Sequence, residues 1–379
     1  MKVLGYTESY ASETVTFITN ELNEVDKRHT LKLLCSKRIN EDRFDLKDIL
    51  IVEYKFNRIF NKIRWWLEQF KIYFWLSNKS FKKEVNSIID EFMPDVIHCH
   101  FGTSFLVLAA NLSKKNLEIP IVISFYGFDA SERIKNKAVV KAYKKYLKNK
   151  NVRSFAVSQN LVDNINSILS PAADAEVLYS GVDTNFFSRI DLPKTEDFVF
   201  LQIASFREKK GHVYALEAFK KLIESEKDKS LKFIIAGFGP LEKRIKEKIL
   251  ELNLGNFVEV LGTQTPSELR SLASRSNCFV HHSITSENGD VEGLPNVLLE
   301  MMSIELPILS TLHGGIPHII EDEVNGYLVP EKDTEAFYKA MKKVLLWEYC
   351  PNNRQKIIDI FSFEKHMENL ENIYSEKDK

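Results

Sequence analysis

The sequence predicts an α/β protein with two doubly wound, Rossmann-like domains. Short apolar runs that fit strands alternate along the chain with segments of helical periodicity, which is typical of parallel sheets covered by helices. A chain of 379 residues is also long enough for two domains that each bury a full core. We expect the first domain at 1–190, the second at 191–361 and a final helix at 362–379.

The expected first domain contains six strand-like runs, at 2–6, 31–35, 95–100, 119–124, 155–157 and 176–179. A helix is expected after the first run, with the string Ser12-Glu13-Thr14 supplying capping side chains at its start. A second helix is expected along the strongly basic segment 133–153. The polar stretch 191–197 contains a proline and has no periodicity, so we expect it to link the domains.

The expected second domain continues the alternation, with strand-like runs at 198–203, 233–236, 257–262, 278–280, 307–311 and 325–329. Thr265 is a capping residue for a helix over 266–275. Pro295 opens another helix, whose apolar positions fit a stripe that faces the core. These elements predict a second parallel sheet with helices between its strands.

Composition excludes several classes of protein. Basic and acidic residues balance at 52 and 53, so no overall field argues for nucleic-acid binding. The four cysteines, Cys35, Cys99, Cys278 and Cys350, are scattered without a Cys-x-x-Cys pair, which predicts reduced residues rather than disulfides or zinc ligands. The apolar start is too short for a signal peptide, and no apolar run of 18 residues could span a bilayer. We therefore expect a cytoplasmic protein.

The chain is organised around the stretch 281–302. A buried strand is followed by a polar loop, and the helix that Pro295 opens points its amino terminus into the same crevice. In an open α/β sheet ligands bind at this edge, and the free amides of the helix favour a phosphate. Glu292 lies in the loop and Glu300 in the second helical turn. Taken alone, the two carboxylates also fit a solvated helix residue and a partner of the helix dipole.

The full string favours the functional interpretation. Glu292-Gly-x-Pro, followed by Glu300 eight residues after the first glutamate, resembles the Glu-x7-Glu motif of the retaining GT-B glycosyltransferases of family 4. The preceding Asn288-Gly289-Asp290 resembles a subgroup that builds bacterial surface polysaccharides of the colanic acid, O-antigen or capsule type. The resemblance implies a GT-B fold, with an interdomain cleft and a C-terminal helix that crosses back to the first domain.

Two segments of the first domain extend the resemblance. The string from Asp95 to Gly102 is similar to the family's Asp-x-x-His-x-His-Phe-Gly, and the period of two places His98 and His100 on one face. Gly127 and Asp129 fit a second family segment, although Tyr126 occupies its histidine position. The resemblance makes His100 and Asp129 candidate catalytic residues. A histidine at a strand end is also often a hydrogen-bonded core group, and that alternative stays open.

The segment 204–211 resembles the part of the family that clamps the diphosphate with an arginine and a lysine. Lys210 fits the lysine position, whereas Ser205 stands at the arginine position and Arg207 is the nearest arginine. Without the resemblance, such a basic pair would be a surface turn. Gly237 and Gly262 end strands on the expected donor side, and His318 stands where the family has a glutamate.

The resemblance implies transfer of a sugar from a nucleoside-diphosphate sugar to a hydroxyl of a glycan or lipid-linked glycan, with retained configuration. Glu300 would accept from the ribose hydroxyls and Glu292 would contact the donor sugar. No cofactor or metal is expected. A nucleotide-sugar 2-epimerase, a phosphorylase and an inactive nucleotide-sugar-binding partner remain alternatives, because they share the fold. The expected ligands of the diphosphate are Arg207, Lys210 and the helix start at Gly293, Leu294, Pro295 and Asn296.

Two segments of the first domain predict contact with an anionic membrane. Residues 55–83 contain eight basic and one acidic residue with interleaved aromatics, and 133–153 contain nine basic residues and no acid. Aromatic and basic residues together suit a lipid headgroup region. Such docking would place the protein on the cytoplasmic face of the inner membrane. The alternative is that the aromatics are core residues and the lysines are merely solvated.

Overall fold

A computed structural model describes residues 1–10, 16–38, 46, 48–53, 78–193, 195–347 and 353–376. Two compact units make up the chain. The first contains Met1–Tyr179 together with Met367–Lys379, and the second contains Ser180–His366. Each unit has its own parallel sheet and its own buried core. The predicted α/β class with two doubly wound, Rossmann-like sheets is therefore confirmed.

The sheet of the first unit has seven strands in the order β3-β2-β1-β4-β5-β6-β7, all parallel. The strand order reverses between β1 and β4, which places the topological switch point at their carboxyl ends. The strands are β1 (Lys2–Tyr10), β2 (Thr30–Arg38), β3 (Ile49–Ile51), β4 (Val96–His100), β5 (Ile121–Phe125), β6 (Val152–Ala156) and β7 (Glu176–Val177).

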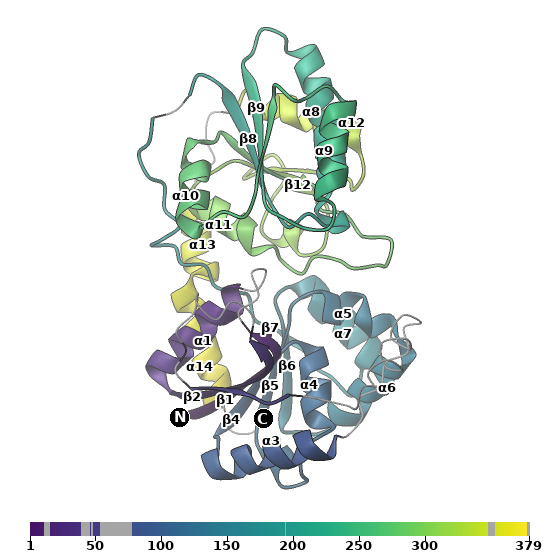
Figure 1. Ribbon diagram of the computed structural model, residues 1–379, viewed down its shortest axis with the longest axis vertical. Coiled ribbons are helices and arrows are strands. Elements are labelled where there is room, and N and C mark those ends of the chain that lie inside the picture. The colour runs from purple at the N-terminus through teal and green to yellow at the C-terminus, as the bar shows by residue number, and fades with distance from the viewer. Residues whose placement is uncertain are drawn as a thin grey trace. The chain divides into compact units, whose positions relative to one another are not determined.

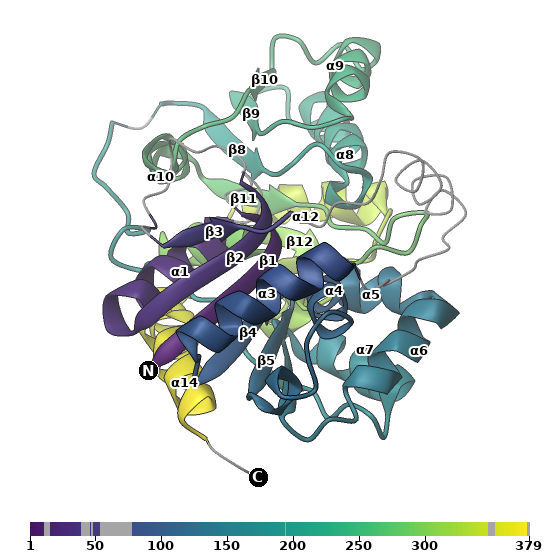
Figure 2. The ribbon, with the colours of Figure 1, turned by 60° about the horizontal axis from the view of Figure 1, so that its bottom comes forward.

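Helices flank this sheet, and Figure 2 shows α3 and α4 in front of its strands. α3 begins where Asn78 Oδ1 accepts the Ser80 and Phe81 N–H groups, and it buries Phe81, Val85 and Ile89, which share one face. The elements are α1 (Thr16–Arg28), α3 (Lys79–Phe92), α4 (Gly102–Ala109), η2 (Asn116–Glu118), α5 (Phe128–Ser131), η3 (Arg133–Lys135), α6 (Lys137–Tyr146) and α7 (Gln159–Leu169).

The sheet of the second unit has six parallel strands in the order β10-β9-β8-β11-β12-β13, so its switch point lies between β8 and β11. Short strands rich in apolar residues suit a sheet that is buried on both faces. The strands are β8 (Phe198–Ile203), β9 (Leu231–Ala236), β10 (Val258–Leu261), β11 (Cys278–His281), β12 (Ile308–Thr311) and β13 (Tyr327–Val329).

Figure 1 shows α8, α9 and α12 on one side of the second sheet and α10, α11 and α13 on the other. The predicted cap of α10 is present as a full capping box, because Thr265 and Glu268 bond each other's backbone N–H groups. The elements are η4 (Glu208–Lys210), α8 (His212–Ser225), α9 (Glu242–Glu251), α10 (Pro266–Arg275), α11 (Asn296–Ser303), η5 (Ile316–His318), α12 (Thr334–Val344) and α13 (Asn353–Phe361).

The last helix, α14 (Phe363–Ser375), begins in the second unit and belongs to the first from Met367 onward. Within the first unit, Tyr374 shares a hydrogen bond with His98 (2.7 Å), and Glu371 pairs with Arg28 (3.1 Å). Among the described residues, no helix is long and apolar enough to cross a membrane. Cys35, Cys99 and Cys278 are buried, and no disulfide joins any of these three.

Two local expectations need correction, and three others fall outside the described residues. The first strand does not end at residue 6, because its pairing with β2 continues to Tyr10, which is buried. The segment 133–153 is not one helix: α6 ends at Tyr146, and Val152 already starts β6. The cap at 12–14, the segment 55–77 and Cys350 lie outside the described residues.

Candidate active site

The loop between β11 and α11 holds the first of the two glutamates. At its tip, Asn288 Oδ1 accepts the Asp290 N–H at 3.0 Å, and Gly289 has a φ of 80°. The N–H and hydroxyl of Ser286 both donate to Asp290 O at 3.2 Å, which closes the turn. α11 then begins after Pro295, as predicted, and no side chain that the structure describes caps its first amides. The loop thus lies at the carboxyl end of a strand that borders the switch point.

Glu292 is buried in this loop and keeps its charge. Its Oε1 lies 2.6 Å from Lys210 Nζ, and its Oε2 lies 3.9 Å from Lys209 Nζ. Burial raises the pKa of the Glu292 carboxyl, but the charges of Lys210 and Lys209 outweigh that effect and lower the pKa to about 2. The carboxyl is therefore ionised at neutral pH, inside a site from which water is largely excluded.

Lys209 belongs to the same cluster, although the sequence singled out only Lys210. Its Nζ lies 3.0 Å from Asp290 Oδ2 as well as near Glu292. Burial lowers the pKa of Lys209, but the neighbouring charges of Glu292 and Asp290 raise it above its ordinary value. Two consecutive lysines reach one loop because η4 is a tight three-residue turn, and because the Ile284 N–H donates to Lys209 O at 2.9 Å.

Arg207 precedes η4 and is exposed, with its charge close enough to lower the pKa of Lys209. The structure therefore places the predicted arginine beside the lysine cluster, with its side chain turned to solvent. Ser205, which stands at the family's arginine position, is two residues earlier and half-buried. The role of Arg207 toward a diphosphate stays a prediction.

Close backbone packing joins the loops that follow β8, β9 and β11. Gly211 has a φ of +58°, and a Cβ there would lie 1.8 Å from His282 O. Gly237 has a φ of +147°, and its Cβ would lie 2.0 Å from Ala204 O. Only glycine fits these two positions without moving the neighbouring chain. Gly237, a predicted donor-side residue, thus holds loops together, whereas Gly262 has open space around it.

Glu300 lies on α11, eight residues beyond Glu292, and is half-buried. Burial raises the pKa of its carboxyl to about 7. The two glutamates of the motif therefore have opposite shifts: Glu292 stays charged across the neutral range, whereas Glu300 titrates within it. Such separated pKa values are frequent at functional sites.

In the first unit, Asp129 is fully buried and accepts backbone hydrogen bonds from two loops. Its Oδ2 accepts the Gly102 N–H at 2.8 Å, and its Oδ1 accepts the Tyr126 and Gly127 N–H groups at 3.1 Å each. Burial raises the pKa of the Asp129 carboxyl, and these three bonds oppose that rise. The carboxylate joins the turn after β4 to the turn after β5, so structure supplies a positioning function for this predicted catalytic residue.

His98 and His100 lie on one face of β4, as the period of two predicted, with ring centroids 4.3 Å apart. His100 Nδ1 shares a 2.8 Å hydrogen bond with the Tyr126 hydroxyl, and Glu21 Oε1 lies 3.8 Å from its Nε2. His98 bonds the Tyr374 and Ser124 hydroxyls at 2.7 and 2.8 Å. Both imidazoles are buried, hydrogen-bonded groups at the carboxyl edge of the sheet.

Within the described part of the chain, Glu21, His98 and His100 are the one group with ligand atoms close enough for a metal ion, within 4.8 Å of one another. Both ring nitrogens of His98 already bond hydroxyl groups, and its ring is tilted by 37° against that of His100. This arrangement fits a hydrogen-bonded network better than tetrahedral coordination.

Comparison with known proteins gives the family. A model of the glycosyl transferases group 1 matches residues 183–360, and a model of glycosyltransferase family 4 matches residues 14–186. The two matches overlap at residues 183–186 and otherwise follow the two halves of the chain. The chain belongs to glycosyltransferase family 4.

Relatives in this family share sequence with much of the chain. WcaL of Escherichia coli, named as a candidate colanic acid biosynthesis glycosyltransferase, is 30% identical over 252 residues, or 66% of this chain. In that match the chain spans only 61% of the relative's own length. The UDP-Gal:α-D-GlcNAc-diphosphoundecaprenol α-1,3-galactosyltransferase of Escherichia coli is 24% identical over 303 residues, which cover 74% of this chain and 75% of that enzyme.

Among solved structures, HepE from Anabaena, described in complex with UDP and glucose, superposes with a TM-score of 0.78. The match covers 99% of this chain and 100% of HepE at 16% identity, so the likeness concerns the fold alone. It agrees with the two parallel sheets and confirms the GT-B fold class of the family 4 chain.

Sequence reasoning found the residues that local motifs carry and missed those that the fold brings in. Glu292, Glu300 and Lys210 lie in recognisable strings. Lys209 was missed, although a second lysine directly beside the predicted phosphate ligand Lys210 was a signal that could have found it. Glu21 carried no signal, because it lies on α1, 77 residues before His98.

Proposed function

We propose that this family 4 chain is a retaining glycosyltransferase of bacterial surface-polysaccharide synthesis. It moves a sugar from a nucleoside-diphosphate sugar to a hydroxyl of a glycan or lipid-linked glycan. The observation that carries the proposal is the ionised, buried Glu292, held at 2.6 Å from Lys210 at the carboxyl edge of the second sheet. The names of the relatives, which concern colanic acid and a diphosphoundecaprenol-linked sugar, support this class of acceptor.

The proposed reaction needs a stabilised diphosphate leaving group. Lys210, Lys209 and Arg207 supply positive charge, and the uncapped amides at the start of α11 supply N–H donors. One charge-assisted contact contributes about 1.5–3 kcal/mol, so two or three reach the scale of transition-state stabilisation. The donor diphosphate would take over Lys210 from Glu292 in part, which would free that carboxylate to contact the sugar.

The remaining steps follow from the family's mode of reaction. Glu300 accepts from the ribose hydroxyls, and Glu292 contacts the donor sugar as charge develops on it. The acceptor hydroxyl attacks from the face on which the diphosphate leaves, and the leaving phosphate takes its proton. Neither a metal nor an organic cofactor has a part in this proposal. His100 and Asp129 contribute on the acceptor side, His100 through its imidazole and Asp129 by holding the loops around it.

The direct test is a panel of nucleotide sugars, with binding followed by calorimetry and transfer followed by product release. We expect one donor class to bind, and nucleoside diphosphate to form only with an acceptor present. Glu292→Gln should lower kcat by about tenfold or more without weakening the binding of free nucleoside diphosphate. Epimerised donor formed without an acceptor would identify an epimerase. Donor binding without any turnover would identify an inactive binding partner.

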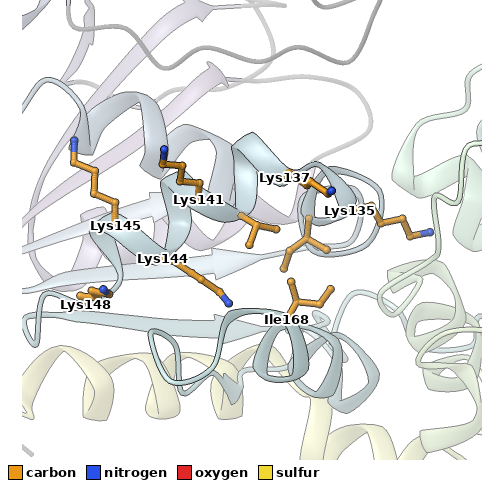
Figure 3. A pocket seen from close by; sticks show the side chains of 9 residues that line it. Lys135, Lys137, Lys141, Lys144, Lys145, Lys148 and Ile168 are labelled. Atoms are coloured by element: carbon orange, nitrogen blue, oxygen red, sulfur yellow. The ribbon is translucent and has the colours of Figure 1, made fainter.

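We further propose that the first unit binds to an anionic membrane surface. A groove between α6 and α7 has an apolar floor and a rim of lysines, with a volume of about 860 Å³ (Figure 3). In Figure 3, Lys141 and Lys145 point away from the groove floor, whereas Lys144 points toward the side of Ile168. Each basic residue near an anionic surface contributes about 1 kcal/mol. The groove is lined by Ile134, Lys135, Lys137, Val140, Lys141, Lys144, Lys145, Lys148 and Ile168.

The structure describes only a small part of the other basic segment, 55–83. In its described part, 78–83, Phe81 is buried in the core, while Lys79, Lys82 and Lys83 are exposed. For this aromatic the core alternative is therefore right, and the lysines are free to meet a surface. Residues 55–77, with the remaining aromatics, lie outside the described residues.

Co-sedimentation with vesicles tests the membrane proposal. We expect binding to anionic vesicles at low salt, loss of binding at high salt, and no binding to neutral vesicles. Lys141→Glu combined with Lys144→Glu should abolish the binding. The matched control, Lys243→Glu with Lys246→Glu on α9 of the second unit, should leave it unchanged. Equal behaviour of both double variants, or no binding to either vesicle, would point to a soluble acceptor.

A further inference from the structure

A buried histidine outside the Glu-x7-Glu motif holds the backbone of its first glutamate. His313 follows β12 and is 1% exposed. Its Nε2 accepts the backbone N–H of Glu292 at 3.0 Å, and its Nδ1 lies 2.6 Å from Glu331 Oε1. Because Nε2 accepts a hydrogen bond from the amide, the ring proton must be on Nδ1, and this N–H donates to Glu331. The two hydrogen bonds therefore require one tautomer.

Glu331 is itself fixed by the loop that contains Glu292. Its Oε2 accepts the Thr285 N–H at 2.7 Å, and its Oε1 lies 3.2 Å from the Thr285 hydroxyl, which donates to it. Burial raises the pKa of the Glu331 carboxyl, but the bonds from Thr285 and His313 outweigh it and lower the pKa. Glu331 is therefore ionised at neutral pH. The loop is thus hydrogen-bonded at two points: Thr285 bonds Glu331, and the Glu292 N–H bonds His313.

The residues after His313 pack against the other side of the same peptide. Gly314 has a φ of +53°, and a Cβ there would lie 2.2 Å from Glu292 O. The Gly315 N–H donates to Gly293 O at 2.8 Å. The segment 313–315 therefore contacts the amide of Glu292, its carbonyl and the carbonyl of the next residue. A backbone held on both sides has little freedom to shift, so the position of the Glu292 carboxylate depends on this segment.

We propose that His313, oriented by Glu331, is a positioning residue that sets the Glu292 carboxylate for glycosyl transfer. The inference rests on the proposed function and adds to it a part that no motif carries. A carboxylate that must meet both Lys210 and a sugar tolerates little displacement, since a shift of about 1 Å at a reacting group can cost a hundredfold in rate. The side-chain bonds that the structure describes for His313 go to the Glu292 N–H and to Glu331, so it acts through the peptide of Glu292.

Two substitutions separate the two hydrogen bonds of His313. In His313→Gln the side-chain oxygen can stand near Nε2 and accept from Glu292, but the donor to Glu331 is lost. In His313→Asn the amide nitrogen can stand near Nδ1 and donate to Glu331, but the acceptor for Glu292 is lost. We expect kcat to fall about tenfold to a hundredfold in the Asn variant and by a smaller factor in the Gln variant. Affinity for free nucleoside diphosphate, which lacks the sugar, should stay within about twofold of the parent.

Asn325→Ala is the control for a purely structural loss in the same unit. Asn325 is buried and bonds Ile319 O and the Glu321 N–H, in a turn separate from the Glu292 loop. This variant should lower the melting temperature and leave kcat unchanged. A fall in kcat in proportion to lost stability, equal in Asn325→Ala and His313→Asn, would overturn the positioning role.

Hydrogen exchange gives a readout that does not depend on activity. The Glu292 amide should exchange faster in His313→Asn, and at nearly the parent rate in His313→Gln. If the parent transfers sugar while both variants match it in kcat and exchange, the inference is wrong and the proposed function stands. If the parent turns over no nucleotide sugar, the proposed function fails and the positioning role fails with it.

Discussion

Glu292 has a charge that its surroundings both oppose and stabilise. Burial disfavours the ionised carboxyl, and two lysines restore it. The same lysines are the proposed ligands of the donor diphosphate. The diphosphate and the Glu292 carboxylate would therefore compete for these two cations. Binding of a diphosphate would weaken the hold of Lys210 on Glu292, and the carboxylate would become a stronger acceptor for the sugar. This coupling makes the lysines part of both binding and turnover.

Substitution of the basic residues tests that coupling. Lys210→Ala should lower kcat/KM by about tenfold or more, because one charge-assisted contact is lost and Glu292 loses its nearest cation. Lys209→Ala should have a smaller effect, since Lys209 also pairs with Asp290. Titration with nucleoside diphosphate measures the binding part of each loss.

Arg207→Ala belongs to the same series but separates two interpretations of the exposed arginine. A loss similar to that of Lys210→Ala would mean that Arg207 has replaced the arginine for which Ser205 stands. Unchanged diphosphate affinity would mean that it is a surface residue and that the family's second cation is absent here.

The raised pKa of Glu300 predicts that donor binding depends on pH. Its ionised form accepts stronger hydrogen bonds than its neutral form, and it ionises as the pH rises through about 7. Affinity for a nucleotide sugar should therefore increase from pH 6 to pH 8. A nucleotide sugar is the right probe, because its diphosphate, esterified at both ends, does not titrate in this range.

Glu300→Gln should bind the nucleotide sugar more weakly and with a flatter pH profile, measured by calorimetry at each pH. In the parent protein, the free energy of unfolding should decrease as the pH rises, whereas donor affinity increases. The folded pKa lies above the unfolded value, so stability conferred by the neutral carboxyl is lost as the pH rises toward 7. A parent and variant with the same slope in binding would remove Glu300 from the donor site.

At the scale of elements, the Asp129 carboxylate holds two segments of the first unit together. It accepts bonds from the amino-terminal end of α4 and from the turn that precedes α5. Asp129→Asn replaces one accepting oxygen by a donor group that faces backbone N–H groups. We expect it to reduce the free energy of unfolding by about 1–3 kcal/mol, the scale of an unsatisfied buried polar group. Chemical denaturation measures the loss.

Nucleotide-sugar binding by the second unit provides the comparison for Asp129→Asn. Binding near the parent value, with reduced stability, would fit a connector. Full stability with lost transfer would instead make Asp129 a residue of the reaction, as the resemblance to the family implied.

At the scale of elements, sequence patterns predicted the strands and helices where the signal is local. Thr265 and Pro295 marked helix starts that the structure confirms, and the loop around Glu292 was placed correctly at a strand end. The three-residue strand β3 was missed, because a run so short has no measurable period. The basic segment 133–153 was assigned to one helix because charge obscured the alternation from Val152 that begins β6.

The candidate site shows the same limit for single side chains. Glu292 and Lys210 were predictable because each lies in a motif. Their 2.6 Å contact, the participation of Lys209 and the opposite pKa shifts of the two glutamates were not, since these depend on how loops from β8 and β11 pack. His313 was not singled out in the sequence, because its bond to the Glu292 N–H spans 21 residues.

For the whole molecule, the two-sheet architecture followed from alternation and length, and the family resemblance implied that the last helix returns to the first domain, as the membership of Met367 onward in the first unit confirms. The contacts that hold α14 there required the fold. Tyr374 bonds His98, and Arg153 pairs with Glu376, so the last residues are fastened to the first unit. Tyr374→Phe should lower the stability of the first unit by about 0.5–1.5 kcal/mol, the net contribution of one hydrogen bond, or more because a buried imidazole loses its partner.

Differential scanning calorimetry with and without a bound nucleotide checks the Tyr374→Phe prediction. The transition that bound nucleotide shifts should stay at the parent temperature, because the ligand is proposed to bind the second unit. The other transition should move down. A uniform shift of all unfolding would show that the two units unfold as one.

During synthesis, the second unit has all of its residues before the first unit does, although the first unit begins the chain. The first unit needs Met367 and the residues after it, and these are synthesised after every residue of the second unit. On the ribosome, the later unit therefore has its full set of residues before the earlier one does. Residues 1–179 must wait with one helix missing from their fold, and their unpaired surface, including the place of Tyr374 beside His98, is exposed during that interval. A premature stop late in the chain would thus damage the unit that was begun first.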